Sequence, residues 1–227
     1  MEPRSIHDRL IWLRRPARVV ASDLAFTALV PEHEIAVAWE ALMRANSRLT
    51  DGPCWHVMGV HRDGHGGATV HVTRTTYKMG AVRGSGLATG FIGLGTKAIA
   101  HWKGRCLIGR RALSCATYPG HWEFSPAGAV EPDEDPAVGI ERELIEECAT
   151  KAVAPARAIA IFFDPIARNW EIVHELMIEC PPDAPPNWEY SELRLTDVGA
   201  LDGGLPAPAS PSSTTMVKIA HRVLSER

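Results

Sequence analysis

Apolar residues recur at helical spacing in three parts of the chain. After Pro31, the segment 32–46 carries Ile35, Ala38, Trp39, Leu42 and Met43 at intervals of one, three or four residues, which predicts an amphipathic helix. The segment 135–148 carries Ala137, Ile140, Leu144 and Cys148 on one stripe, with Pro136 suited to the first helical position and Asp133 or Asp135 suited to cap the start. A last helix is expected over 213–225.

Strand-like runs lie between these helices. Two of them, 54–62 and 68–77, flank the glycine-rich turn DGHGG at 63–67 and predict a hairpin. The further strand candidates are 98–102, 105–109, 121–128, 158–163, 170–180 and 193–198. We interpret the glycine-rich passage 84–95 as turns, 181–186 as a proline-rich loop, and 203–213 as a linker. Strands around a few helices indicate an α/β fold, a mixed sandwich.

Composition narrows the class of protein. The chain has 227 residues, is 45% hydrophobic and has a formal net charge of -3, which suits a soluble domain, alone or with a subdomain. No run of like charges points to a nucleic-acid surface, so no nucleic-acid partner is expected. The N-terminus interleaves arginines with apolar residues and fits neither a secretory signal nor a membrane span, so we expect a cytoplasmic protein without a membrane partner.

The cysteines and histidines do not indicate a structural metal site. Five cysteines are widely spaced without a CxxC pair, so buried free thiols are expected. Four histidines lie within residues 56–71, but their spacing on the predicted hairpin argues against a zinc site.

Carboxylates concentrate on the second predicted helix. Glu143, Glu146 and Glu147 would project from one side of it, about one turn apart, beside the single cation Arg142. Crowding of this kind is unfavourable unless a positive charge compensates it. Oxygen ligands suit Mg²⁺ or Mn²⁺ rather than zinc. The alternative is a solvated, glutamate-rich helix face.

The spacing around these carboxylates favours the metal site. Glu134 follows Gly128 after five residues, and Arg142-Glu143 follows Glu134 after seven. Then come the aliphatic Leu144, one further residue and Glu146-Glu147. This order resembles the signature of the Nudix hydrolases, G-x5-E-x7-R-E-U-x-E-E-x-G-U. The chain departs from the signature at its end, where Ala149 and Thr150 replace a glycine and an aliphatic residue. Alanine accepts the left-handed conformation expected at this helix exit only at a cost.

The resemblance implies a fold and a reaction. It implies the Nudix α/β/α sandwich with a mixed sheet over residues 96–227, preceded by an N-terminal extension over 1–95 that contains the helix and the hairpin. The implied reaction is hydrolysis of a nucleoside diphosphate linked to another moiety, with Mg²⁺, or Mn²⁺, as cofactor. The implied partner is therefore a small nucleotide molecule.

The resemblance also implies residue roles. Glu143 and Glu147 would be metal ligands, Glu146 would bind a second metal or act through water, and the carbonyl of Ala127 would be a further ligand. Arg142 would hold the glutamates in position through Glu134 or Glu143. A general base would come from the segment that matches the signature, residues 128–150, which we call the box, or from a later loop. Glu189 is the first candidate for an extra ligand or base. Its competitors are Glu171, Glu175 and Glu192.

A second, less specific resemblance concerns the substrate. Residues 39–95 resemble the region before the box in Nudix proteins that hydrolyse UDP-sugars: Leu49, Asp51-Gly52, Tyr77 and Leu94-Gly95 follow in order, although Asn46-Ser47 replaces Asn-Pro. A UDP-sugar, giving UMP and a sugar 1-phosphate, is the leading expectation. The alternatives are hydrolysis of ADP-ribose or another nucleoside diphosphate derivative, a binding or regulatory module without turnover, and the reading of these short motifs as ordinary turns.

Aromatic residues are the candidates for contact with a nucleobase. Trp122 and Phe124 alternate on the strand that enters the box and so share a face, and Tyr77 lies beside Lys78. We therefore name Tyr77, Trp122 and Phe124 as substrate-binding candidates, against the alternative that the strand aromatics belong to the core.

Residues 1–30 are expected either to pack on the core or to mediate self-association as a homodimer.

Overall fold

The computed structural model describes residues 10–115, 117–182 and 188–225. Its α-helices are α1 (Glu32–Ala45), α2 (Lys78–Ala81), α3 (Pro136–Cys148) and α4 (Ser213–Ser225), and short 3-10 turns span Val82–Ser85 and Val198–Leu201. The three predicted helices are thus confirmed. None of the helices in the described ranges combines the length and the apolar character that crossing a membrane would need.

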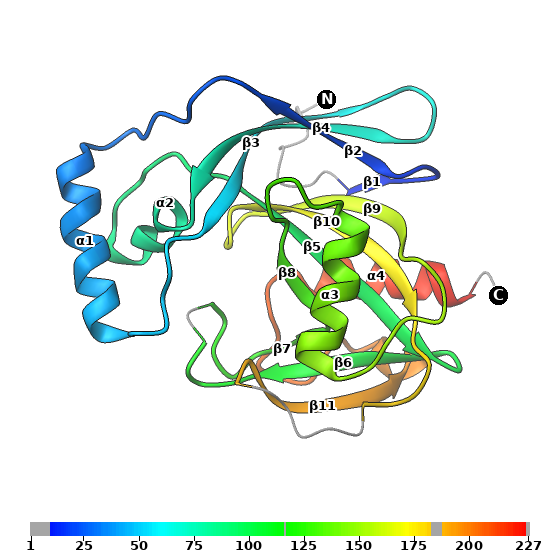
Figure 1. Ribbon diagram of the computed structural model, residues 1–227. Coiled ribbons are helices and arrows are strands. Elements are labelled where there is room, and N and C mark those ends of the chain that lie inside the picture. Colours follow the sequence, from blue (N-terminus) through cyan, green and yellow to red (C-terminus); the bar gives the residue numbers. More distant parts are fainter. Residues whose placement is uncertain (1–9, 116, 183–187, 226–227) are drawn as a thin grey trace, which may run out of the picture.

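The strands join in one curled, mixed sheet (Figure 1). Its main path runs β1-β9-β10-β5-β3-β4-β2, while β6 pairs with β5, β7 and β11, and β8 pairs with β5. Two strand pairs are parallel, β5 with β10 and β2 with β4. The strand bounds are β1 Leu10–Trp12, β2 Ala17–Ser22, β3 Pro53–Arg62, β4 Ala68–Thr76, β5 Gly93–Trp102, β6 Arg105–Arg111, β7 Trp122–Phe124, β8 Ala127–Ala129, β9 Arg157–Asp164, β10 Asn169–Met177 and β11 Tyr190–Asp197.

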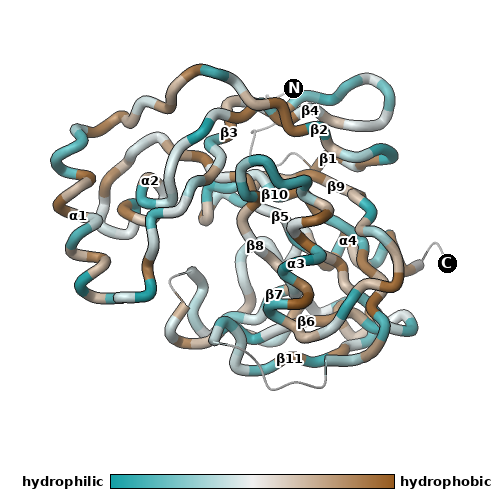
Figure 2. The backbone as a smooth tube through the Cα atoms, in the orientation of Figure 1, coloured by the Kyte–Doolittle hydropathy of each residue, from teal (hydrophilic) through white to brown (hydrophobic). Residues whose placement is uncertain are grey.

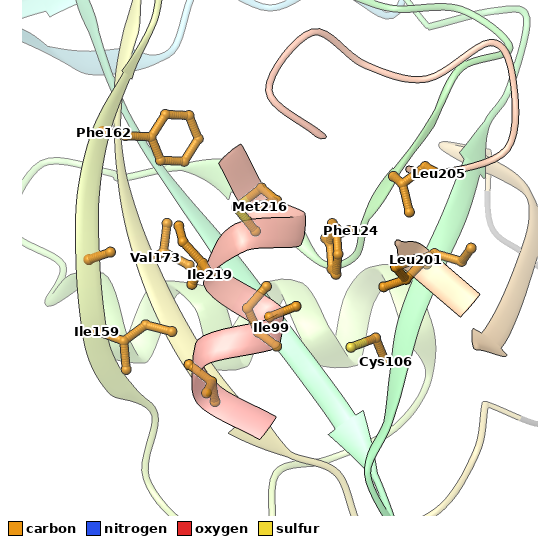
Figure 3. Packing of buried hydrophobic residues seen from close by; sticks show 14 of the residues in the cluster. Ile99, Cys106, Phe124, Ile159, Phe162, Val173, Leu201, Leu205, Met216 and Ile219 are labelled. Atoms are coloured by element: carbon orange, nitrogen blue, oxygen red, sulfur yellow. The ribbon is translucent and has the colours of Figure 1, made fainter. Parts of the chain in front are cut away.

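Helices cover both faces of the central strand β5. Side chains alternate across a strand, and Ala98 and Ala100 pack with Ile140 and Leu144 of α3. Ile99, between the two alanines, packs with Met216 and Ile219 of α4 on the other face (Figure 3). In Figure 2, α3 alternates along its length between hydrophobic and hydrophilic residues, as a helix with one buried stripe does. The result is an α/β/α sandwich.

The predicted hairpin is present, and its turn explains the DGHGG sequence. β3 and β4 pair antiparallel, and the Asp63 carboxylate accepts hydrogen bonds from the backbone N–H groups of His65 (2.7 Å) and Gly67 (2.9 Å). Gly64 and Gly66 take positive φ values of 79° and 91°, a conformation that a side chain would disfavour. The turn therefore requires both the carboxylate and the glycines.

The N-terminal extension shares its sheet with the rest of the chain. β1 pairs with β9 and β2 pairs with β4, so the described part of residues 1–30 packs on the core, while residues 1–9 lie outside the described residues. The boundary expected after residue 95 falls inside β5. Helix α1 lies at one end of the molecule beside α2, where Ile35 and Trp39 pack on Val82 (Figure 1).

Two passages differ from the sequence predictions. β5 begins at Gly93, so Leu94-Gly95 belongs to a buried strand and the prediction of turns up to residue 95 was wrong. Glycine is uncommon in strands, so the sequence favours turns here. In β5, however, glycine leaves room for a neighbouring side chain, because a Cβ on Gly95 would collide with the Glu171 carboxylate. The passage 203–213 is more than a linker, since Leu205 lies in the core. The proline-rich loop 181–186 lies largely outside the described residues.

Candidate active site

The ends of α3 are fixed by local chemistry. Asp135 caps the start, because its carboxylate accepts a hydrogen bond from the backbone N–H of Ala137 at 2.8 Å, and Pro136 occupies the first helical position. The helix ends at Ala149, which has φ 52° and ψ 32°, the left-handed conformation. The exit turn of the Nudix signature is thus formed, although alanine stands where glycine would be relaxed.

The three box glutamates of α3 occupy different environments. Glu147 is buried and Glu143 is largely buried, and both line a cavity of about 740 Å³. The side chain of Glu146 is 56% exposed and is not part of that lining. The three side chains therefore do not share one environment, although helical spacing places them about one turn apart. Glu147 lies at the edge of the buried stripe because residue 147 follows Ile140 and Leu144 at helical spacing.

Arg142 holds the acidic residues around it. Its guanidinium donates two hydrogen bonds to the Glu134 carboxylate (3.1 and 3.2 Å), one to Glu143 (2.9 Å) and one to Glu146 (3.1 Å). A planar fork that binds one carboxylate with two bonds fixes the orientation of both groups. Arg142 therefore contacts both partners expected from the sequence and one more.

Glycine is required where α3 meets β8. A Cβ on Gly128 would lie 2.7 Å from Cγ of Glu143, well inside van der Waals contact. The missing side chain lets Glu143 lie across the β8 backbone and reach the cavity. In the same way, a Cβ on Gly139 would lie 2.8 Å from the Glu134 carboxylate. The box glycine thus has a steric reason in this fold.

Glu147 and Glu189 meet in the cavity. Glu147 accepts a hydrogen bond from the backbone N–H of Ala127 at 3.2 Å and shares a hydrogen bond with Glu189. Burial raises the pKa of Glu147, and contact with Glu189 raises it further. Burial also raises the pKa of Glu143 to about 7, although Arg142 opposes the shift. The first candidate for an extra ligand or base therefore lies against a box glutamate.

A buried charged network forms the floor of the cavity. Lys97 donates to Glu123 at 3.4 Å, and Arg111 donates to the other oxygen of that carboxylate at 2.7 Å. Burial alone raises the pKa of Glu123, but attraction to Lys97 and Arg111 outweighs it and the net shift is downward. Glu171 is also buried here, and burial raises its pKa to about 7. Lys97, Arg111, Glu123 and Glu171 all line the cavity.

Sequence analysis missed most of this network. Its signal was present, since Lys97, Glu123 and Glu171 each interrupt an apolar strand run, and a charge in a central strand needs a partner or a ligand. What the sequence does not give is which of these charges lie side by side. That depends on strand pairing between segments far apart in the chain.

The remaining candidates are placed as follows. Tyr77 lines the cavity and is 41% exposed. Trp122 and Phe124 are buried in the core cluster that includes Met216 and do not line the cavity; Glu123 between them does. Neither aromatic side chain is therefore placed to contact a substrate in this cavity. Of the competitors of Glu189, Glu171 lines the cavity, Glu175 is buried against His101 (3.2 Å), and Glu192 is exposed.

The donor set of the site suits a hard divalent cation. Glu143, Glu147 and Glu189 line one cavity together with Ala127, and oxygen atoms are the ligands that Mg²⁺ and Mn²⁺ prefer. Glu147 and Glu189 already lie in contact through their carboxylates, where the charge of a cation would compensate both. Within the described ranges, no three acidic, histidine or cysteine side chains already converge as a ready-made metal cluster. The chemistry of these donors therefore fits a divalent cation.

The N-terminal extension contributes one wall of the cavity. Asn46, Arg48 and Leu49 follow α1, and Tyr77 follows β4; all four line it together with the glutamates. Asp51 fixes this wall, because its carboxylate accepts a hydrogen bond from the backbone N–H of Lys78 at 2.9 Å and pairs with the Lys78 ammonium at 3.5 Å. The site is therefore formed by both expected parts of the chain.

Comparison with known proteins places this arrangement in context. Residues 98–214, about half of the chain, match the model of the NUDIX domain. An uncharacterised Nudix hydrolase of Pseudomonas aeruginosa is 34% identical over 133 residues, which cover 57% of this chain and 78% of that protein. A NUDIX hydrolase structure from Nitrosomonas europaea is 23% identical, covers 59% of this chain and 70% of that one, and gives a TM-score of 0.45. The structure of a bifunctional NMN adenylyltransferase/ADP ribose pyrophosphatase of Francisella tularensis, complexed with AMP and a manganese ion, is 17% identical. The match covers 58% of this chain and 41% of that one, with a TM-score of 0.47.

Proposed function

The chain belongs to the Nudix family and is a Nudix hydrolase, and on that premise we propose that it cleaves the diphosphate of a nucleoside diphosphate linked to another moiety. One observation carries the proposal. Glu143, Glu147 and Glu189 line the same 740 Å³ cavity as Lys97 and Arg111. A cavity with carboxylates for a cation and cations for phosphate oxygens suits a diphosphate, whose charge is concentrated on non-bridging oxygens.

Nudix hydrolases generally use divalent metals, and we propose Mg²⁺, with Mn²⁺ as a substitute. Glu143 and Glu147, with the carbonyl of Ala127, would hold it, which leaves the role of base to Glu189. When bound, the ion neutralises phosphate charge and lowers the pKa of a water molecule that attacks phosphorus. Glu146, which is exposed, is assigned a supporting part through Arg142.

The chain's own residues have separate tasks in this proposal. Glu189 accepts the proton of the attacking water, because it faces Glu147 inside the cavity. Arg142 keeps Glu143 in its orientation before the ion binds. Lys97 is buried and Arg111 is partly buried, and Glu123 holds both, so they are positioned to contact phosphate oxygens with little loss of side-chain entropy.

For the moiety on the far side of the diphosphate we propose a sugar, so that a UDP-sugar yields UMP and a sugar 1-phosphate. The support is the resemblance of residues 39–95, of which Asn46, Leu49 and Tyr77 line the cavity. The same residues would also contact a nucleoside diphosphate derivative such as ADP-ribose, and an assay with a panel of substrates distinguishes the two.

The test is phosphomonoester release by the purified chain with Mg²⁺ and a panel of UDP-sugars, ADP-sugars, ADP-ribose, NADH and nucleoside triphosphates. We expect release from the diphosphate-linked compounds only in the presence of Mg²⁺ or Mn²⁺. Preference for ADP-ribose would refute the UDP-sugar proposal and keep the reaction class. No release from any compound would refute both.

A further inference from the structure

A second cavity adjoins the one that contains the glutamates. It has a volume of about 420 Å³ and shares with the first seven lining residues, among them Leu49, Tyr77, Tyr118, Ala129 and Asn169. Its other lining residues are mainly apolar or aromatic: Leu42, Trp55, Phe91, Leu94 and Ile166. We call this second cavity the apolar slot. A flat aromatic group suits such a lining better than a sugar, whose hydroxyl groups each need a hydrogen-bond partner.

One cation lies in the wall of the apolar slot. Arg83, in the 3-10 turn Val82–Ser85, lines both the slot and a smaller cavity of about 180 Å³ on its other side. Its Nη1 atom is buried, yet no hydrogen-bond partner for it is found in the described part of the chain. A buried guanidinium N–H without a partner is costly, and arginine does not escape the cost by losing its proton.

The neighbours of Arg83 do not supply that partner. Asp164 lies near enough for its negative charge to favour the charged form of Arg83. One Asp164 oxygen, however, already accepts hydrogen bonds from the backbone N–H groups of Ile166 (2.9 Å) and Ala167 (3.0 Å). The Tyr118 hydroxyl also donates to Asp164. Arg168 adds a second positive charge near Arg83. The described residues around Arg83 therefore leave its buried Nη1 group without an acceptor.

We propose that the apolar slot holds the nucleobase of the substrate and that Arg83 selects bases with a ring carbonyl, such as uracil and guanine, over adenine. The proposal rests on the nucleotide hydrolysis proposed above. A guanidinium offers only donors, and the oxygens of uracil and guanine accept from it. The exocyclic group of adenine at the equivalent position is an amine, which is itself a donor and meets the guanidinium unfavourably.

The test measures binding rather than hydrolysis, with UMP, GMP and AMP as probes titrated calorimetrically into the full chain. The variants are Arg83→Met, which keeps the apolar stem, Arg83→Lys, which keeps a donor, and the matched control Arg44→Met, at an exposed arginine of α1. We expect the wild type to prefer UMP and GMP over AMP. In Arg83→Met the affinity for UMP and GMP should fall by about 10- to 100-fold, and that for AMP should change little. Arg83→Lys should retain part of the preference for UMP and GMP, and the control Arg44→Met should retain all of it.

The outcomes separate this proposal from the proposed function. A merely structural role of Arg83 would lower all three affinities together, so an unchanged ratio in a folded Arg83→Met would overturn the proposal. Equal affinities, tighter AMP or no binding of any probe in the wild type would overturn it as well. An Arg83-dependent preference without phosphomonoester release from any compound would support the slot and refute the hydrolysis. Phosphomonoester release without that preference would support the hydrolysis and refute the proposed role of the slot and Arg83.

Discussion

Replacing Ala149 by glycine should stabilise the protein. Ala149 ends α3 with φ 52°, and a left-handed conformation costs a residue with a Cβ about 1 to 2 kcal/mol. Glycine removes that cost but makes the unfolded chain more flexible, which takes back about 0.4 to 1 kcal/mol. Ala149 is exposed, so losing its methyl group sacrifices little apolar burial. The net gain is about 0.5 to 1 kcal/mol, which for a chain of this size raises Tm by about 1 to 4 °C.

The assay is thermal unfolding followed by circular dichroism, with chemical denaturation to obtain the free energy of unfolding. The matched control is Ala137→Gly in the first turn of α3, at an ordinary helical position, where glycine should cost about 0.5 to 1 kcal/mol. The two substitutions are thus expected to have opposite signs. If Ala149→Gly lowers Tm as Ala137→Gly does, the reasoning about a strained helix exit is wrong. Turnover should not change, because the backbone already has the conformation that glycine prefers.

Three further predictions follow from the site. Gly128→Ala should displace Glu143 and lower turnover by about 100-fold, whereas Gly203→Ala, whose added methyl group would meet open space, should not; steady-state rates of the two variants check this. Arg142→Lys loses the two-bond grip on Glu134 and should raise the Mg²⁺ concentration for half-maximal rate by about 10-fold or more, with exposed Arg44→Lys as control; an unchanged Mg²⁺ dependence would contradict the holding role of Arg142. Burial raises the pKa of Glu171 to about 7, so its contribution to stability is complete below about pH 4 and is lost as pH rises through 7. Between pH 5 and pH 8, the free energy of unfolding of Glu171→Gln should therefore rise by up to about 3 kcal/mol relative to that of the wild type. Denaturation curves that show the same difference between the two proteins at both pH values would refute the shift.

Local signals in the sequence predicted the helices and the position of the acidic box. The stripe of Ile140 and Leu144, the cap at Asp135 and the proline after it are all short-range features, and α3 begins and ends within one residue of its prediction. The same periodicity could not show that Glu147 is buried and Glu146 is exposed. That difference depends on which strands α3 packs against, and strand pairing is long-range.

The limits of sequence reasoning are clearest in the cavity wall. Glu189 meets Glu147 only because β11 pairs with β6, and Arg83 reaches the apolar slot only because α2 and the following turn fold under α1. Neither contact has a local signature. Trp122 and Phe124 were interpreted from strand alternation, which correctly gives them one shared face but does not say which face meets the core.

The central claim is that Glu147 takes part in metal-dependent cleavage of a diphosphate. The most direct measurement is phosphomonoester release from the substrate panel at increasing Mg²⁺ concentration, by wild type, Glu147→Gln and the exposed control Glu40→Gln, with Tm recorded for each. We predict Mg²⁺-dependent release by wild type and Glu40→Gln, and a loss of about 100-fold or more in Glu147→Gln without a fall in Tm. Full turnover by a folded Glu147→Gln would contradict the account.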